Sequence, residues 1–340
     1  MLREQENERT RHAFARCCIV ALAFVSGCNE SIEPSPAGAS RDGPHPNAAA
    51  PPTDSAVVPP AVLFLPEDYE ELASAAMPAR SSRCPPEMVL VRDRFCIDRF
   101  EVTLVEKTTA RELSPHYPPT RRYTRTLFER FVERPARPQG PLQTLLPFPQ
   151  PPDFQLTTDF EPRAVSKPGA LPAGYLNKYS AQAACENAAK RLCSRNEWVT
   201  ACRGERNQSF PYGATYEEGA CNVHRKSHPA RLLHGDASQN HLDPRLGLTQ
   251  DNDGPLLRRT GATPRCKSTW NGDAAFDMVG NLDEWIDEAA GSFVGGFYSR
   301  GTTAGCAATI DLHSPDYLDY SLGTRCCREA RSPDEPHSAP

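Results

Sequence analysis

Alternating hydrophobic residues mark the start of the ordered part of the chain, in the stretch CPPEMVLVRDRFCIDRFEVT. Such alternation predicts strands whose side chains point to opposite faces in turn. The polar tripeptide RDR at 92–94 interrupts the pattern and predicts the turn of a hairpin. The apolar positions that carry the pattern are Met88, Leu90, Phe95, Ile97, Phe100 and Val102.

Two later segments have the spacing of amphipathic helices. In SAQAACENAAKRL, Ser180 is available as the N-cap of a helix. One face of that helix collects Ala181, Ala184, Cys185, Ala188 and Leu192. In SRNEWVTACRG, Ser194 and Glu197 have the spacing of a capping box, and the helix is expected to stop at Gly204. The apolar face of this second helix is formed by Trp198, Ala201 and Cys202.

The remaining segments have weaker patterns. Residues 107–164 are rich in proline and predict a long, irregular surface excursion with at most one helix, from Thr124 to Glu133. Gly, Asn and Asp are abundant after Gly204, and strand-like sequence returns in GSFVGGFYSRG and SLGTRCCREA. Two helices, short strands and long loops predict an irregular α+β domain over residues 83–330.

The first 27 residues predict a processing signal rather than part of the domain. The apolar run Cys17 to Gly27 is too short to span a bilayer. The sequence VSGC, which ends at Cys28, resembles the lipobox of bacterial lipoproteins, whose cysteine becomes the lipidated first residue. The alternative is an ordinary secretory signal followed by a chance cysteine. Either interpretation takes the chain out of the cytoplasm.

Composition separates the domain from its flanks. The chain has 340 residues, 34 of them proline, and a mean hydropathy of −0.56, which favours one domain with tails over two domains. Residues 28–82 are rich in Pro and Ala and predict a disordered tether, and 331–340 predict a disordered tail. Removal of residues 1–27, with four Arg and three Glu, changes the formal net charge from −5 to −6. Nucleic acid is therefore not an expected partner.

Cysteine usage indicates an oxidising compartment. Of 13 cysteines, two leave with the signal and Cys28 would carry lipid. The remaining ten are an even number, which favours five disulfides. The alternative is a zinc site, but no CxxC pair or Cys/His cluster has the usual ligand spacing. Arithmetic alone leaves the pairing open.

Several blocks, in order, resemble one family: FCIDRFEVT, KRLCSRNEWVTACRG, FPYG, FDMVGNLDEW, GGFY and GTRCC. Together they resemble the formylglycine-generating enzyme family, also called sulfatase-modifying factor domains. The resemblance covers about residues 84–329 and implies a loop-rich variant of the C-type-lectin-like fold. One departure is Asp283, where the family usually has Trp.

The resemblance also implies particular disulfides. Two recurring bridges of the family carry over as Cys185 with Cys326 and Cys202 with Cys306. The other cysteines are then assigned as Cys84 with Cys96, Cys221 with Cys266 and Cys193 with Cys327.

Calcium is the cofactor that the resemblance implies. The first site would take the Asp277 and Glu284 side chains and the Gly280 and Leu282 carbonyls, with Asn281 holding the turn by hydrogen bonds to nearby backbone. Oxygen ligands on an irregular loop suit this hard cation. The alternative is a tight turn with solvated carboxylates beside Trp285 in the core. A second family site could be supplied by Asn222 and Asp253.

Four histidines, His224, His228, His234 and His241, lie close together in the sequence. Pro229, Gly235 and Pro244 interrupt any helix that could gather them, so solvated loop histidines are expected.

Catalysis depends on the stretch VGGFYSRGTTAGCAATI, residues 294–310. In the enzymes of the family, the segment after the paired glycines carries two cysteines that hold copper, a soft ion that prefers thiolates. Here residues 297–305 contain no cysteine, and Cys306 matches a third, structural cysteine. Copper is therefore not expected. The prediction is a non-catalytic lipoprotein of the cell envelope, anchored in a membrane by its N-terminal lipid, that binds an unknown protein or glycan. The alternative is a copper-dependent oxidase that generates formylglycine on a client sulfatase.

Overall fold

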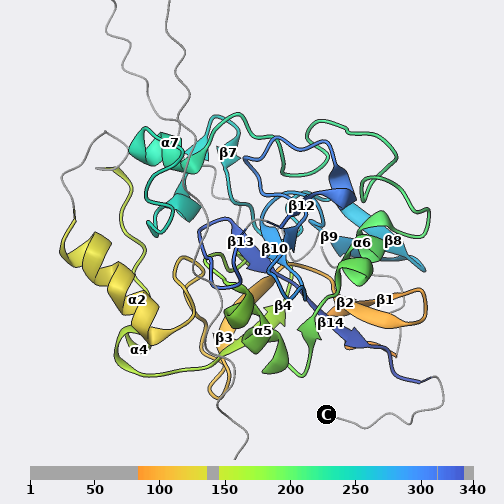
Figure 1. The fold of residues 1–340 in the computed structure, drawn as a ribbon, viewed down its shortest axis with the longest axis horizontal. Helices are drawn as coiled ribbons and strands as arrows, with labels where there is room; N and C mark the ends of the chain where they lie inside the picture. Colours follow the sequence, from red (N-terminus) through yellow and green to blue (C-terminus); the bar gives the residue numbers. More distant parts are fainter. Residues whose placement is uncertain (1–82, 136–144, 312, 333–340) are drawn as a thin grey trace, which may run out of the picture. The chain divides into compact units, whose positions relative to one another are not determined.

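A computed structural model describes residues 83–135, 145–311 and 313–332, all within the compact unit Pro59–Pro340. These residues form an irregular α+β fold of short strands, few helices and long loops (Figure 1), as the sequence predicts. The signal segment 1–27, Cys28, the tether 28–82 and all but two residues of the tail 331–340 lie outside the described residues. No helix in the described ranges is long and apolar enough to cross a membrane.

The first sheet has four antiparallel strands in the order β1-β2-β14-β5. The predicted hairpin is confirmed, because β1 and β2 pair across a turn in which Arg92 and Asp93 have positive φ. The strand bounds are β1 Met88–Val91, β2 Phe95–Asp98, β5 Arg191–Leu192 and β14 Cys326–Glu329.

The hairpin is buried on both faces rather than on one. Val89, Val91 and Ile97 pack in the largest core cluster. Met88 and Leu90 pack on the opposite face in a cluster with the Cys84–Cys96 disulfide. The sheet is therefore an internal layer of the domain, which explains why VLV is a continuous apolar run.

The second sheet has the order β12-β11-β10-β13, with β10 and β13 parallel and the other pairs antiparallel. Its strands are β10 Asp283–Trp285, β11 Phe293–Val294, β12 Thr309–Ile310 and β13 Leu322–Thr324. Strand β11 ends where Gly295 and Gly296 take φ values of 91° and 77°. A Cβ at Gly295 would lie 3.1 Å from the Trp198 ring, so the chain turns here only because the residue is glycine.

Three two-stranded ribbons complete the strands. They pair β3 Val102–Glu106 with β4 Pro162–Ser166, β6 Gln250–Asp251 with β7 Gly254–Pro255, and β8 Lys267–Trp270 with β9 Asp273–Phe276.

The described part of the 107–164 excursion is more ordered than predicted. The expected helix begins three residues early, as α2 Arg121–Phe128 capped by Thr120, and continues as the π-helical turn η1 Glu129–Glu133. A second helix, α4 Asp153–Thr157, was not predicted. Tyr117, Leu127 and Phe131 form a small core of their own, so the excursion is not merely a surface loop.

Helices α5 Lys178–Glu186 and α6 Arg195–Arg203 are the two expected from the sequence. Ser194 and Glu197 form the predicted capping box of α6, which ends at Gly204. The predicted cap of α5 is wrong, because Asn177 is the N-cap and Ser180 is its partner at the third helical position. Helix α5 also stops before Leu192, which lies in β5.

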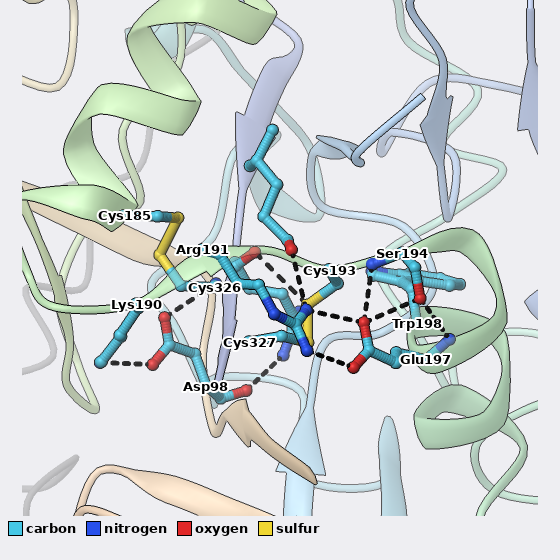
Figure 2. Close-up of a disulfide and its surroundings, with 12 residues drawn as sticks. Asp98, Cys185, Lys190, Arg191, Cys193, Ser194, Glu197, Trp198, Cys326 and Cys327 are labelled. Carbon is cyan, nitrogen blue, oxygen red and sulfur yellow. Dashed lines mark hydrogen bonds and ion pairs between the residues drawn. A yellow bond between two sulfur atoms is a disulfide. The ribbon is translucent and has the colours of Figure 1, made fainter. Parts of the chain in front are cut away.

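Five disulfides join the segments, with the pairs Cys84–Cys96, Cys185–Cys326, Cys193–Cys327, Cys202–Cys306 and Cys221–Cys266. These are the pairs given in the sequence analysis. The adjacent cysteines of β14 point to opposite sides (Figure 2). Cys326 belongs to the core cluster under α5, and Cys327 to the cluster under α6. Strand β14 therefore ties two cores together.

The four histidines lie around a short helix, α7 Pro229–His234, that was not predicted. Pro229 begins this helix and Gly235 ends it in a left-handed conformation, so both residues delimit a helix rather than exclude one. The side chain of His234 is buried, 3.4 Å from the Asp243 carboxylate, so the expectation of solvated histidines is wrong for this residue. Two 3₁₀ turns follow along the chain, η2 Leu246–Leu248 and η3 Gly305–Ala307.

Candidate functional site

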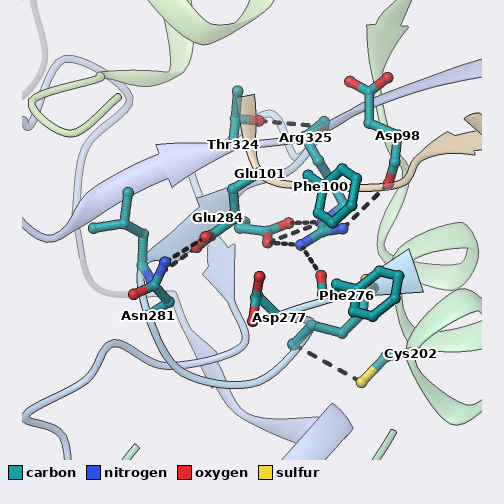
Figure 3. Close-up of polar contacts among 12 residues, drawn as sticks. Asp98, Phe100, Glu101, Cys202, Phe276, Asp277, Asn281, Glu284, Thr324 and Arg325 are labelled. Carbon is teal, nitrogen blue, oxygen red and sulfur yellow. Dashed lines mark hydrogen bonds and ion pairs between the residues drawn. The ribbon is translucent and has the colours of Figure 1, made fainter. Parts of the chain in front are cut away.

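Four charged residues from three parts of the chain meet in the interior, and we call them the buried charge cluster: Glu101, Asp277, Glu284 and Arg325 (Figure 3). Each is at most 3% exposed. Strand β10 supplies Glu284, and the loops before it and before β14 supply Asp277 and Arg325. Three carboxyl groups around one guanidinium leave an excess of potential negative charge.

Arg325 and Glu284 form the centre of the cluster. Arg325 donates from Nε and Nη2 to the two Glu284 oxygens at 2.7–2.9 Å. It also donates to the backbone oxygens of Phe276 and Asp98, at 2.9 and 3.2 Å. Trp198 donates its indole N–H to Glu284 Oε2 at 2.6 Å. The Glu284 carboxylate therefore already accepts four hydrogen bonds, which fills its acceptor capacity.

The other two carboxyl groups are held by backbone donors. Asp277 accepts a hydrogen bond from Gly261 N at 2.7 Å, and its own backbone has a φ of 56°. Glu101 accepts from Leu282 N at 2.9 Å and from the Asn281 amide at 2.6 Å. Burial raises the pKa of Asp277 to about 7 and raises that of Glu101 well above its usual value.

Asn281 links distant segments instead of holding a local turn. Its side-chain oxygen accepts from Arg258 N and from Asn222 Nδ2, both at 3.0 Å. Its side-chain nitrogen donates to Glu101 and to the Arg258 carbonyl. The expected bonding to nearby backbone is therefore wrong, because the partners lie 23 to 180 residues away along the chain.

Asn222 and Asp253 occupy different environments. Asn222 is 3% exposed and donates to the Leu256 carbonyl and to Asn281, but its side-chain oxygen is buried without a hydrogen-bond partner in the structure. Asp253 is exposed in the turn between β6 and β7. Burial lowers the pKa of Arg258, and the charges of Asp253 and Asp277 oppose this shift. The Asn222 oxygen is a buried acceptor that an external donor or cation would satisfy.

Asp283 is a site residue whose role the sequence analysis did not predict. It is fully buried in β10, and Arg300 Nη1 lies 2.8 Å from its Oδ1. Burial raises the pKa of Asp283 to about 7, and the nearby Arg300 opposes the rise. The pair ties the glycine-rich segment to β10, at the position where the family usually has Trp. A carboxylate followed by an arginine 17 residues later gave no recognisable signal in the sequence.

The glycine-rich segment contains no thiol near this pair. Residues 297–305 include no cysteine, and Cys306 is bonded to Cys202 at the end of helix α6. Every cysteine in the described ranges is in a disulfide, and the most exposed of them, Cys84, is 8% accessible. In the same ranges no group of three or more His, Cys, Asp or Glu is arranged to hold a metal ion.

Comparison with known protein families gives a match over most of the chain. Residues 48–329 match the sequence model of the family described as sulfatase-modifying factor enzyme 1-like domain. No curated protein matches the chain.

Three solved structures show low similarity. The P3c variant of the major tropism determinant has 13% identity and a TM-score of 0.37, with 74% of this chain and 54% of that chain covered. CarF has 13% identity and a TM-score of 0.34, with 69% and 86% covered. PvdO from Pseudomonas aeruginosa has 12% identity and a TM-score of 0.31, with 73% and 100% covered. The chain thus spans about half the length of the tropism determinant.

Proposed function

The chain belongs to the family of sulfatase-modifying factor enzyme 1-like domains, with the irregular C-type-lectin-like fold, and we propose that it is a non-catalytic member. In this proposal a lipid on Cys28 anchors it at the cell envelope, where the domain binds a protein or glycan.

The state of the cysteines carries the proposal. Formylglycine formation by this family needs a thiol pair that can hold copper(I), because soft ions prefer thiolate ligands. Described cysteines are all paired in disulfides, and nine of the ten are at most 3% exposed. The segment that should carry the pair instead holds Arg300, which is bonded to Asp283. A partly buried ion pair thus lies in the segment where the resemblance implies chemistry.

The experiment is an aldehyde assay. The purified mature protein is loaded with copper and incubated in air with a sulfatase-motif peptide, and the peptide mass is measured. No aldehyde is expected. An aldehyde product that disappears when a single cysteine is replaced, in a variant that remains folded, would establish the copper-dependent oxidase instead.

Calcium is proposed as a structural cofactor. At the first site the ligands would be the Asp277 and Glu284 side chains with the Gly280 and Leu282 carbonyls. Glu284 fits this role poorly, because Arg325 and Trp198 already fill its acceptor capacity.

At the second site the ligands would include Asn222 and Asp253. Asn222 fits better, since its buried side-chain oxygen has no hydrogen-bond partner in the structure. Its nitrogen donates to two oxygen acceptors, which supports the assignment of the two amide atoms. Bound calcium would supply the missing partner.

A further inference from the structure

A polar pocket of about 370 Å³ opens at the end of helix α6, beside strand β8. Four cationic side chains line it: Arg203, Arg206, Arg265 and Lys267. Two carboxylates, Glu205 and Glu217, are the acidic residues of the lining. Its lining residues belong neither to the buried charge cluster nor to residues 294–310. The pocket is therefore separate from the site described above.

Three of the four cations have no carboxylate partner in the described ranges. Arg265 is paired with Glu217, whereas no ion pair involves Arg203, Arg206 or Lys267. The Arg203 Nε atom is buried and has no hydrogen-bond partner in the structure. The pocket therefore has three cationic side chains whose charge no carboxylate of the described residues offsets through an ion pair.

Most hydrogen-bond acceptors near the pocket already have donors, whereas the Tyr212 hydroxyl is a donor still available to a ligand. The last carbonyls of α6 are already occupied, because Ala201 O accepts from the Trp270 indole and Arg203 O accepts from Gln208 N. Tyr212 accepts a hydrogen bond from Glu217 N, which leaves its own hydroxyl hydrogen available to a ligand. Glu205 accepts from Asn271 N, so part of its negative charge is satisfied outside the pocket.

We propose that this pocket binds a small anion that carries phosphate, sulfate or carboxylate groups and is about the size of an acidic monosaccharide. Guanidinium groups present paired N–H donors that match these anions. The volume falls in the range of about 300–1,000 Å³ that small-molecule sites occupy. The inference rests on the proposed ligand-binding function and deepens it, because it gives the ligand a chemical class.

The test is a calorimetric titration of the mature protein with five probes. They are inorganic phosphate, inorganic sulfate, glucose 6-phosphate, glucuronate and, as a neutral control, glucose. At least one anion should bind, more weakly as ionic strength rises, and glucose should not. The anion that binds most tightly identifies the charged group of the ligand, because glucuronate carries a carboxylate and the other three carry phosphate or sulfate. The difference in affinity between glucose 6-phosphate and inorganic phosphate measures the contribution of the sugar.

Variants locate the binding. Arg206→Gln and Lys267→Met should each weaken the strongest anion about tenfold, the effect of losing one charge-assisted hydrogen bond. The matched control is Arg122→Gln, which removes the same charge from an exposed position on α2 and should change nothing.

Two outcomes overturn the proposal: none of the four anions binds at millimolar concentration, or Arg122→Gln weakens binding as much as the pocket variants. The aldehyde assay on the same preparations keeps the two proposals apart. An aldehyde product together with anion binding would reject the non-catalytic function and keep the pocket.

Discussion

Arg325 and Glu284 form an ion pair that is closed to solvent, with Nη2 and Oε1 2.7 Å apart and neither side chain more than 1% exposed. The pair joins β10 to the residue before β14, and thus connects the two four-stranded sheets. The same guanidinium reaches the backbone oxygens of Asp98 and Phe276, which come from two further segments. The Arg325 side chain therefore joins its own segment to the three segments that contain Glu284, Asp98 and Phe276.

Removal of either partner should destabilise the domain strongly. Arg325→Met leaves Glu284 buried beside two other carboxyl groups, and a lone buried charge of this kind costs about 3–5 kcal/mol. Glu284→Gln removes the one carboxylate to which the Arg325 side chain donates hydrogen bonds, and should cost a similar amount. Urea unfolding followed by circular dichroism measures both, and the double variant should cost less than the sum of the two.

The exposed pair Lys107–Glu161 is the control for that comparison. Its Nζ–Oε2 distance is 2.6 Å, but its side chains are 45% and 64% exposed. Lys107→Met should change the free energy of unfolding by at most about 1 kcal/mol. Equal losses of unfolding free energy in Lys107→Met and Arg325→Met would show that burial does not increase the contribution of the Arg325–Glu284 pair.

His116 should make the stability depend on pH. Its side chain is buried, its Nδ1 atom has no hydrogen-bond partner in the structure, and burial lowers its pKa to about 4. Because its folded pKa lies below its unfolded pKa of about 6.5, the unfolded chain binds the proton first as pH falls. The neutral His116 side chain makes its whole contribution to the free energy of unfolding above pH 6.5. As pH falls from 6.5 to about 4, the protein loses this contribution, which is about 3 kcal/mol in total.

The His116→Leu variant isolates this contribution. Carboxyl groups elsewhere titrate in both proteins, so the difference between their unfolding free energies from pH 4 to pH 7 reports His116 alone. The wild type should lose more stability than the variant on acidification. Parallel curves would mean that His116 keeps an ordinary pKa in the folded state.

Local signals in the sequence predicted local structure well. The Ser194 and Glu197 capping box is encoded within four residues, and α6 begins where they predict. The cap of α5 was missed because Asn177 lies outside the apolar pattern, although it has the same spacing to Ser180. Strand β4 was missed because its pairing with β3 depends on a partner about 60 residues away. Local patterns do not encode such pairings.

The buried charge cluster could be predicted only in part. The family resemblance gave roles to Asp277 and Glu284 but none to Glu101 or Arg325, although the blocks FCIDRFEVT and GTRCC contain these two residues. Charged residues are rarely buried without a partner, so each one is expected at the surface until its partner is known. Here Arg325 lies 41 residues from Glu284, and Glu101 lies 180 residues from Asn281, so only the fold brings these partners together.

Calcium should stabilise the domain. At about 100 times its dissociation constant it would add roughly 2.7 kcal/mol to the free energy of unfolding. Melting temperatures with calcium and with a chelator measure this gain, which Asp253→Asn should reduce. Asp159→Asn, at a side chain that is 85% exposed, is the control and should keep the full gain. An unchanged melting temperature on chelation, in both the wild type and Asp277→Asn, would remove calcium from the proposal.

The disulfides should differ in their contribution according to loop length. Cys193 and Cys327 are 134 residues apart, whereas Cys84 and Cys96 are 12 apart. Chain entropy credits the longer loop with up to about 5 kcal/mol and the shorter with about 3. Replacing each pair by Ser should therefore destabilise the Cys193–Cys327 variant more. Non-reducing peptide mapping checks the pairs themselves, and a free thiol at Cys306 would contradict them.

The last prediction concerns the membrane anchor proposed at Cys28. Replacing Cys28 by Ser removes the atom that would carry the lipid and leaves residues 83–332 unchanged. Fractionation of cells that express each form should find the wild type with membranes and Cys28→Ser in the soluble envelope fraction. As a control, Cys17→Ser alters a cysteine inside the signal and should leave the protein in membranes. Retention of Cys28→Ser in membranes, at the wild-type level and after a salt wash, would require an anchor other than a lipid on Cys28.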